Sequence, residues 1–219
     1  MCGRFGFDSN RRQAEPLESF MGFPAREGRG DLRPTDSILA LLKKPGMQGE
    51  QEIQGSWLRW GLIPSWSRKG FAGRPLINAR AETIDEKPSF KDAFSRRRCV
   101  VPATHYDEWQ AEGIGVNEHK QRVRIFHEEG AYGMAGVWER WEGGEGPVFS
   151  CAIITVSACR QLEGVHPRMP AMLTEKEAEV WLDPDRASVQ VKELLRPCQR
   201  VCWEYVHEEK KNPVQGTLF

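Results

Sequence analysis

The 219-residue chain lacks several features that would assign it to a class at once. It has no net charge, because Lys plus Arg and Asp plus Glu both number 31, so no global field favours nucleic acid or a membrane as a partner. It has no long apolar run, no signal-like opening segment and no internal repeat, so we expect a cytoplasmic protein without membrane contacts. Its length suits one substantial hydrophobic core.

The six cysteines also lack a framework. Their spacing predicts no set of disulfides, which is consistent with a reducing compartment. Cys198 and Cys202, with His207 nearby, form a partial set of metal ligands, but the spacing matches no standard zinc pattern. We therefore expect no metal and no cofactor. The cysteines are at positions 2, 99, 151, 159, 198 and 202.

What the sequence does have is a strand-rich middle with shorter helical segments. The pattern predicts an α+β fold, mainly an antiparallel β-sheet or partly closed barrel with peripheral helices, in a single domain over residues 1–207 with a flexible tail at 208–219. Expected strands lie at 56–63, 99–101 (ending at Pro102), 123–126, 132–138 and 148–156. Expected helices lie at 13–21, 88–97, 174–181 and 187–195, and Thr174 is the predicted N-cap of the third. Gly-rich loops are expected at 26–30, 44–55 and 142–147.

Cys2 carries the most informative chemistry in the chain. Removal of Met1 would leave an α-amino group and a thiol on one residue. The amine can form an imine with an aldehyde, and the thiol can then close a five-membered thiazolidine ring. Ring closure is intramolecular and so has a large effective molarity. The alternative is an ordinary cytosolic thiol beside the initiating methionine.

Other polar residues stand in apolar, sheet-like context and supply what imine chemistry needs. Glu108 and His166 can exchange protons, and Asn78 can hold an oxygen atom without titrating. Each also has a structural explanation. Glu108 could be a surface strand residue, His166 a loop histidine with its hydrogen bonds satisfied, and Asn78 a turn cap. Arg80 and Glu82, two apart on a strand, could form an ion pair.

These residues occur in short blocks spread along the chain. The blocks are Met1-Cys2-Gly3-Arg4-Phe5, Trp60-Gly61-Leu62-Ile63-Pro64-Ser65-Trp66, Asn78-Ala79-Arg80-Ala81-Glu82-Thr83, Arg98-Cys99-Val100-Val101-Pro102-Ala103, Glu108-Trp109, Ala135-Gly136-Val137-Trp138-Glu139 and His166-Pro167-Arg168-Met169-Pro170. Together they resemble the SRAP family, the SOS response-associated peptidases that include abasic-site processing proteins. The blocks follow the family order from residue 1 to about Leu182, and their combination is specific although any one would be weak.

The resemblance implies that mature Cys2 links covalently and reversibly to the ring-opened aldehyde of an abasic site in single-stranded DNA. It implies that Asn78 orients the sugar or the terminus, that Glu108 is an acid and base, and that His166 assists ring opening and reversal. A plain imine would invite β-elimination and strand cleavage, whereas a thiazolidine protects the strand. The family name further implies self-processing peptidase activity that removes Met1, lyase-like chemistry, and a role in DNA damage repair near the nucleoid.

Two positions depart from the family pattern. Many relatives have a Gly-aromatic-Tyr-Glu-Trp run where this chain has His105 to Trp109, so Asp107 adds a carboxylate beside Glu108. On a regular strand the two would face opposite sides, and we expect little coupling between them. Cys159 stands where a polar residue is commoner.

Binding of single-stranded DNA combines cations for phosphates with aromatic rings for bases. Arg4, Arg80 and Arg168 are the predicted phosphate contacts, and Trp66, after the Pro64-Ser65 turn, is the predicted wedge against a base. The alternative for Trp66 is packing in the core. The neutral chain predicts moderate, salt-sensitive affinity, with permanence supplied by the covalent bond.

The tail Gln215-Gly216-Thr217-Leu218-Phe219 resembles the short peptides that dock into bacterial sliding clamps. The alternatives are a frayed terminus or a last strand packed on the body. We expect a monomer. Two other functions compete with the leading one: an N-terminal-nucleophile thiol amidohydrolase or peptidase using Cys2 and His166 with Asn78 or Glu108, and a noncovalent single-stranded-DNA module.

Overall fold

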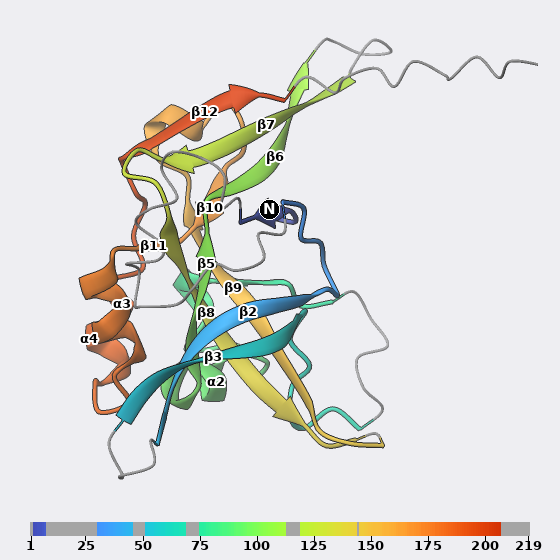
Figure 1. Cartoon of the computed structure of the whole chain (residues 1–219), viewed down its shortest axis with the longest axis vertical. Coiled ribbons are helices and arrows are strands. Elements are labelled where there is room, and N and C mark those ends of the chain that lie inside the picture. Colours follow the sequence, from blue (N-terminus) through green and yellow to red (C-terminus); the bar gives the residue numbers. More distant parts are fainter. Residues whose placement is uncertain are drawn as a thin grey trace, which may run out of the picture.

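The computed structural model describes residues 2–7, 30–45, 51–68, 75–112, 119–143 and 145–206. These ranges form two β-sheets with short helices on the outside (Figure 1). The strands are β1 Phe5–Gly6, β2 Ser37–Pro45, β3 Gln51–Trp60, β4 Asn78–Arg80, β5 Arg98–Ala103, β6 His105–Glu112, β7 His119–His127, β8 Tyr132–Trp141, β9 Val148–Ser157, β10 Arg168–Pro170, β11 Met172–Leu173 and β12 Val201–Tyr205. The helices are α2 Lys91–Arg96, α3 Glu175–Leu182 and α4 Ser188–Lys192, with 3₁₀ turns η1 Ala81–Thr83 and η3 Arg160–Leu162.

The larger sheet closes into a barrel of five strands. Its order is β10-β9-β3-β2-β5-β8-β11, and β9 also pairs with β8, so β9, β3, β2, β5 and β8 form a ring. Most of these pairings are antiparallel, but β3 and β4 run parallel to β9. The predicted α+β fold with a mainly antiparallel, partly closed barrel and peripheral helices is confirmed, with these two parallel pairings as an addition.

The smaller sheet has the order β1-β6-β7-β12 and lies above the barrel in Figure 1, with the amino terminus between them. The strands β6 and β7 pair antiparallel along their whole length, and the short β1 adds to the free edge of β6. Of the strands expected at 123–126, 132–138 and 148–156, the last two pair directly as β8 and β9, whereas the first lies in β7 of the smaller sheet. Strand β6, which pairs with β7, was not among the expected strands.

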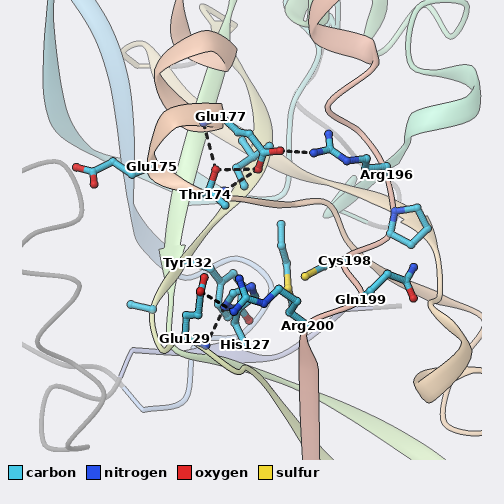
Figure 2. A pocket seen from close by; sticks show the side chains of 14 residues that line it. His127, Glu129, Tyr132, Thr174, Glu175, Glu177, Arg196, Cys198, Gln199 and Arg200 are labelled. Carbon is cyan, nitrogen blue, oxygen red and sulfur yellow. Dashed lines mark hydrogen bonds and ion pairs between the residues drawn. The ribbon is translucent and has the colours of Figure 1, made fainter.

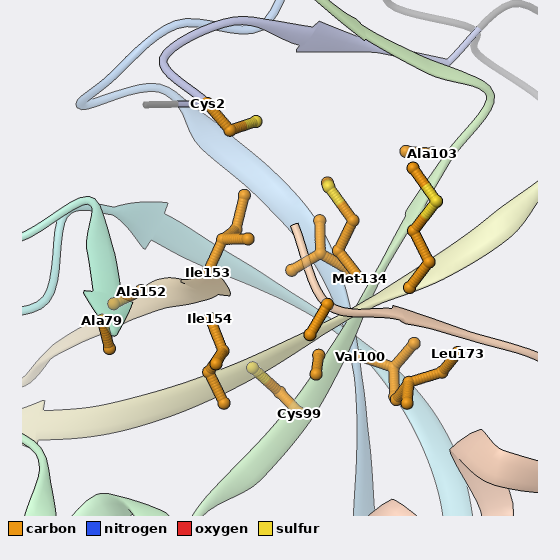
Figure 3. Close-up of a cluster of buried hydrophobic side chains, with 14 of the residues drawn as sticks. Cys2, Ala79, Cys99, Val100, Ala103, Met134, Ala152, Ile153, Ile154 and Leu173 are labelled. Atoms are coloured by element: carbon orange, nitrogen blue, oxygen red, sulfur yellow. The ribbon is translucent and has the colours of Figure 1, made fainter. Parts of the chain in front are cut away.

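The apolar core fills the barrel and continues toward the amino-terminal segment. All six residues of β5 are buried, and β9 is buried from Ser150 to Val156, as expected of strands covered on both faces. Figure 3 shows Cys2 at the top of this cluster, with Ile153 and Met134 below it. Cys2 is therefore part of the packed interior.

The helices cover one flank of the barrel. Thr174 caps α3 with a capping box, in which its hydroxyl accepts the N–H of Glu177 while the Glu177 carboxylate accepts the N–H of Thr174. This confirms the predicted N-cap. The indole of Trp181 donates to the carbonyl oxygen of Cys99 at 2.9 Å and so ties α3 to β5. No helix in the described part of the chain is long and apolar enough to cross a membrane.

Three boundaries differ from the sequence-based expectation. Strand β5 continues through Pro102 because β5 pairs with β8 along its length but with β2 only at Val100, so past that point no second ladder is interrupted. The expected loop at 44–55 is largely strand, with β2 reaching Pro45 and β3 starting at Gln51. The helices α2 and α4 are shorter than expected. The expected helix at 13–21, the loop at 26–29 and the tail from 208 lie outside the described residues.

Candidate active site

Cys2 is held at the seam between the two sheets. The neighbouring strand β1 pairs with β6, and Phe5 also exchanges two backbone hydrogen bonds with Leu32. One step before β1, the carbonyl oxygen of Arg4 accepts the N–H of Asp107 at 2.8 Å. The carbonyl oxygen of Cys2 itself accepts the side-chain amide of Asn78 at 3.0 Å. The amino-terminal segment is thus fixed from both sides.

The Cys2 thiol is fully buried. Burial raises the pKa of the thiol well above its ordinary value, and the nearby Glu108 carboxylate raises it further. The backbone N–H of Arg4 acts in the opposite direction. The sulfur is therefore a protonated thiol near neutral pH, and its reaction as a nucleophile requires a base that takes its proton.

Glu108 is the acidic group next to the thiol. Its side chain lies on β6 and is only 3% exposed. Burial raises its pKa to about 7; the positive amino terminus of the chain opposes this shift and Asp107 adds to it. Near neutral pH this carboxyl group is present in both protonation states. It can give a proton in one step of a reaction and accept one in the next.

Asp107, beside it in sequence, points to the other face of β6. It is fully buried, and it accepts hydrogen bonds from Arg122 at 2.5 Å and Arg124 at 2.9 Å on β7. The predicted opposite orientation of Asp107 and Glu108 follows from the strand alternation and agrees with these contacts. Asp107 therefore belongs to an ion-pair network on the far side of the sheet and has the smallest effect on the pKa of Glu108.

His166 approaches Glu108 from the loop before β10. Its Nδ1 atom lies 3.9 Å from Oε1 of Glu108 and accepts the N–H of Arg168 at 3.0 Å. Nδ1 also lies 3.1 Å from the carbonyl oxygen of Arg168, to which it can donate when it carries the proton. Burial lowers the pKa of His166, so the ring is neutral near pH 7. A neutral imidazole can assist proton transfer in either direction.

Asn78 lies at the start of β4, which pairs with β9 of the barrel. Its Nδ2 atom donates to the carbonyl oxygen of Cys2, whereas its Oδ1 atom is buried and has no hydrogen-bond partner among the described residues. An unpaired buried oxygen costs roughly 1–3 kcal/mol, so it is a strong acceptor for an N–H or O–H group that enters the site. The structure thus brings Cys2, Asn78, Glu108 and His166 together.

The predicted phosphate contacts differ in how they are engaged. Arg4 is ion-paired with Asp31, and Arg168 donates to Glu82 at 2.6 and 2.9 Å. Arg80 is exposed on β4 and forms no ion pair within the described ranges. The suggested pairing of Arg80 with Glu82 is therefore wrong, because the Glu82 carboxylate faces Arg168 instead.

Trp66 is on the surface. Its side chain is 63% exposed, and its indole N–H donates a long bond of 3.4 Å to the carbonyl oxygen of Pro88. The alternative that this ring packs in the core is therefore wrong. An exposed tryptophan held at one point is free to contact a ligand.

A pocket of about 450 Å³ lies elsewhere, between α3, the turn from β7 to β8 and the segment before β12 (Figure 2). None of the four predicted catalytic residues lines it. Its rim carries the ion pairs of Arg196 with Glu177 and of Arg200 with Glu129. Among the described residues no three His, Cys, Asp or Glu side chains could hold a metal ion, and His207 lies outside them.

Two buried tyrosines near Cys2 were not predicted from the sequence. Tyr106 and Tyr132 are both at most 2% exposed, and neither hydroxyl has a hydrogen-bond partner in the described structure. Burial raises the pKa of both hydroxyl groups well above the ordinary value, and the nearby Cys2 raises each further. Tyr106 could have been found by alternation along β6, since it lies two residues before Glu108 and shares its face.

Comparison with known proteins agrees with the family resemblance of the sequence blocks. The family model "SOS response associated peptidase (SRAP)" matches residues 1–213. The abasic site processing protein YoqW of Bacillus subtilis is 32% identical over 203 residues, which cover 90% of this chain and 87% of that protein. The abasic site processing protein HMCES of Rattus norvegicus is 31% identical over 190 residues, covering 73% of this chain and 54% of that protein.

Solved structures show the same fold. A phage-related protein from Bordetella bronchiseptica superposes with a TM-score of 0.72 at 25% identity over 95% of both chains. A protein from Bacteroides thetaiotaomicron superposes with a TM-score of 0.68 at 28% identity over 81% of this chain and 78% of that one. The match of the family model over almost the whole sequence shows that this chain belongs to the SOS response associated peptidase (SRAP) family.

Proposed function

We propose that this protein processes abasic sites in DNA, and that Cys2, once Met1 is removed, forms a thiazolidine with the ring-opened aldehyde of an abasic site in single-stranded DNA. The observation that carries the proposal is the arrangement around Cys2: Asn78 donates to its carbonyl oxygen, and Glu108, with a pKa of about 7, is near enough for its charge to raise the pKa of the thiol. The names of the relatives, abasic site processing proteins, support the same substrate.

The first step joins the amine to the aldehyde. The α-amino group of mature Cys2 attacks the aldehyde carbon, which gives a carbinolamine after transfer of a proton from nitrogen to oxygen. Glu108 in its acid form then protonates the departing hydroxyl group. Water leaves as the C=N bond of a protonated imine (iminium) forms, and Glu108 remains as a carboxylate. His166, neutral at pH 7, is placed near Glu108 to accept or return a proton in this step.

The second step closes the ring. The Glu108 carboxylate takes the thiol proton, the Cys2 sulfur bonds to the iminium carbon, and the electron pair of the C=N bond moves to the nitrogen, which already carries its proton. Glu108 is thereby returned to its acid form. The sum of both steps is aldehyde plus aminothiol giving thiazolidine plus water. Because burial raises the pKa of the thiol, the thiol stays protonated near neutral pH and needs a base. The Glu108 carboxylate is that base. The product has no iminium group, so it does not promote β-elimination of the strand.

The buried thiol also separates this proposal from an ordinary thiol hydrolase. Such enzymes depend on a thiolate with a lowered pKa, whereas burial raises the pKa of Cys2. The thiazolidine route needs the sulfur only after the amine has reacted. We propose that the peptidase activity is limited to hydrolysis of the bond between Met1 and Cys2, which releases methionine and frees the amine.

The exposed Arg80 and Trp66 are the proposed first contacts with the strand. Arg4 and Arg168 would bind phosphates by exchanging their carboxylate partners Asp31 and Glu82 for the backbone of DNA. Such exchange fits the moderate, salt-dependent affinity expected of a neutral protein.

The test is incubation with a single-stranded oligonucleotide that holds one abasic site, followed by a denaturing gel. Wild type should give a shifted, heat-resistant band. Cys2→Ala and a form with an uncleavable amino-terminal extension should both lose it, because one lacks the sulfur and the other the free amine. Cys2→Ser is the matched control, since it keeps the amine and should give only an adduct that requires borohydride to survive. Absence of a band with wild type whose Met1 is shown by mass spectrometry to be removed would contradict the proposal.

A further inference from the structure

Strand β12 forms an edge of the smaller sheet and carries two exposed aromatic side chains. Trp203 is 39% and Tyr205 is 37% exposed. Their rings pack edge to face, with centroids 5.3 Å apart and planes at 76°. Each ring therefore fixes the other while leaving much of its own surface open to solvent. Neither has a role in the chemistry proposed for Cys2.

The register places these rings on the same face of the sheet as the candidate active site. Glu108 on β6 lies opposite Val123 on β7, and Val123 lies opposite Tyr205 on β12. Directly opposed residues of antiparallel strands point to the same side, and strands are about 4.8 Å apart, so Tyr205 is about 10 Å from Glu108 across the sheet. The neighbouring row contains Tyr106 and Trp203 in the same way.

A chain of hydrogen bonds connects the rings to the loop that carries His166. The hydroxyl of Tyr205 donates to Oε1 of Gln110 at 2.9 Å. The amide Nε2 of Gln110 donates to the carbonyl oxygen of Gly164, also at 2.9 Å, and Gly164 is two residues before His166. The aromatic pair is thus continuous with the site through both the sheet and this loop.

The chemistry of the substrate indicates what these rings bind. An abasic nucleotide has no base, so stacking must come from the nucleotides beside it. Exposed aromatic rings are the usual platforms for unpaired bases. Because this protein has no net charge, stacking would supply a larger share of its affinity than it does in a basic protein. We infer that Trp203 and Tyr205 form a stacking platform for the unpaired nucleobases next to the abasic nucleotide at Cys2. This inference rests on the proposed function.

The first experiment measures noncovalent affinity for undamaged single-stranded DNA by fluorescence anisotropy, so that it does not depend on crosslinking. Trp203→Ala with Tyr205→Ala should raise Kd about tenfold or more. Tyr205→Phe keeps the ring and should stay near wild type. Trp57→Ala is the matched control, because Trp57 is also exposed but lies on β3 of the barrel, and it should leave Kd unchanged. Circular dichroism checks that each variant is folded.

The second experiment uses the crosslinking reaction at subsaturating DNA. Oligonucleotides carry one abasic site, and the bases on its 5′ or 3′ side are replaced by baseless spacers that keep the phosphates. If the rings stack on a base, removing that base slows wild type about as much as removing the rings. Removing both should then add little further, since the two changes delete one interaction. A failure of wild type to crosslink would contradict the proposed function and leave the anisotropy result standing.

Three results would overturn the platform. Equal Kd values for wild type and the double alanine variant would do so, as would strictly additive effects of ring and base removal on both sides. The third is a dimer of wild type in analytical ultracentrifugation that the double variant abolishes, because the rings would then be a contact between two copies of this chain.

Discussion

The side-chain amide of Asn78 donates a hydrogen bond to the carbonyl oxygen of Cys2, linking residues 76 positions apart in sequence. Asn78 begins a strand that pairs with β9 of the closed barrel, so it is held by one of the most buried parts of the protein. The position of the reactive residue is therefore set by the barrel and not only by the short β1 that follows it.

We predict that Asn78→Ala slows crosslinking about tenfold, because one hydrogen bond that orients the terminus is lost. Asn78→Asp is the sharper variant, since it keeps the shape but cannot donate to a carbonyl oxygen, and it should be slowed to a similar degree. Single-turnover rates on an abasic oligonucleotide at saturating protein provide the measurement. A wild-type rate in Asn78→Asp would show that the donor is dispensable.

The buried Glu108 should make the protein less stable as pH rises. Its pKa is about 7 in the folded protein against an ordinary value of 4.5, so between these values the folded state holds a proton that the unfolded state has lost. Stability falls with pH wherever the folded state binds more protons. The contribution of Glu108 to the free energy of unfolding is therefore fully present below about pH 4.5 and declines between about pH 4.5 and pH 7. Above pH 7 the free energy of unfolding is lower by about 3 kcal/mol.

Glu108→Gln tests this relation, because the amide is isosteric and does not titrate. The variant should lose most of the pH dependence between pH 5 and 8 in urea unfolding, and be more stable than wild type at pH 8. It should also crosslink at least tenfold more slowly, since both proton transfers lose their carrier. An unchanged slope of stability against pH would mean that Glu108 ionises at its ordinary pKa in the folded protein.

Local patterns predicted the parts of the fold that depend on nearby residues. The N-cap at Thr174 and the opposite orientation of Asp107 and Glu108 follow from spacing alone. Pairing between distant strands was not predictable in this way. Nothing in β9 itself indicates that it pairs with β3 and β4 in parallel and closes the barrel with β8, because such contacts are set by the whole topology.

The candidate active site was likewise predictable only in part. Sequence motifs named Asn78, Glu108 and His166, but whether they meet depends on three separate strand and loop positions that only the structure brings together. The partners of the arginines were also out of reach. Arg168 meets Glu82 across 86 positions, and no spacing rule selects that carboxylate over others.

Tyr106→Phe should leave the protein as stable as wild type or make it up to about 1 kcal/mol more stable. The Tyr106 hydroxyl is fully buried without a partner among the described residues, and removing an unsatisfied polar group removes its desolvation cost. Urea unfolding at pH 6 is the measurement, with Tyr205→Phe as an exposed control that should change little. A loss of more than 1 kcal/mol would mean that the hydroxyl is hydrogen-bonded in solution.

Neutralising Glu82 should strengthen binding of single-stranded DNA. Its carboxylate accepts hydrogen bonds from both terminal guanidinium nitrogens of Arg168, and this contact lowers the pKa of Glu82. At neutral pH the charge of Arg168 is therefore neutralised by an ionised partner. Glu82→Gln keeps the shape while removing the charge, which leaves Arg168 available to a phosphate. We expect a lower Kd and a slope of log affinity against log salt that is steeper by about 0.7, the value for one additional phosphate contact on a single strand.

Arg168→Gln should weaken binding and make the slope shallower by a similar amount. If Glu82→Gln changes neither Kd nor slope while Arg168→Gln lowers only thermal stability, Arg168 acts through its bond to Thr155 as a structural residue.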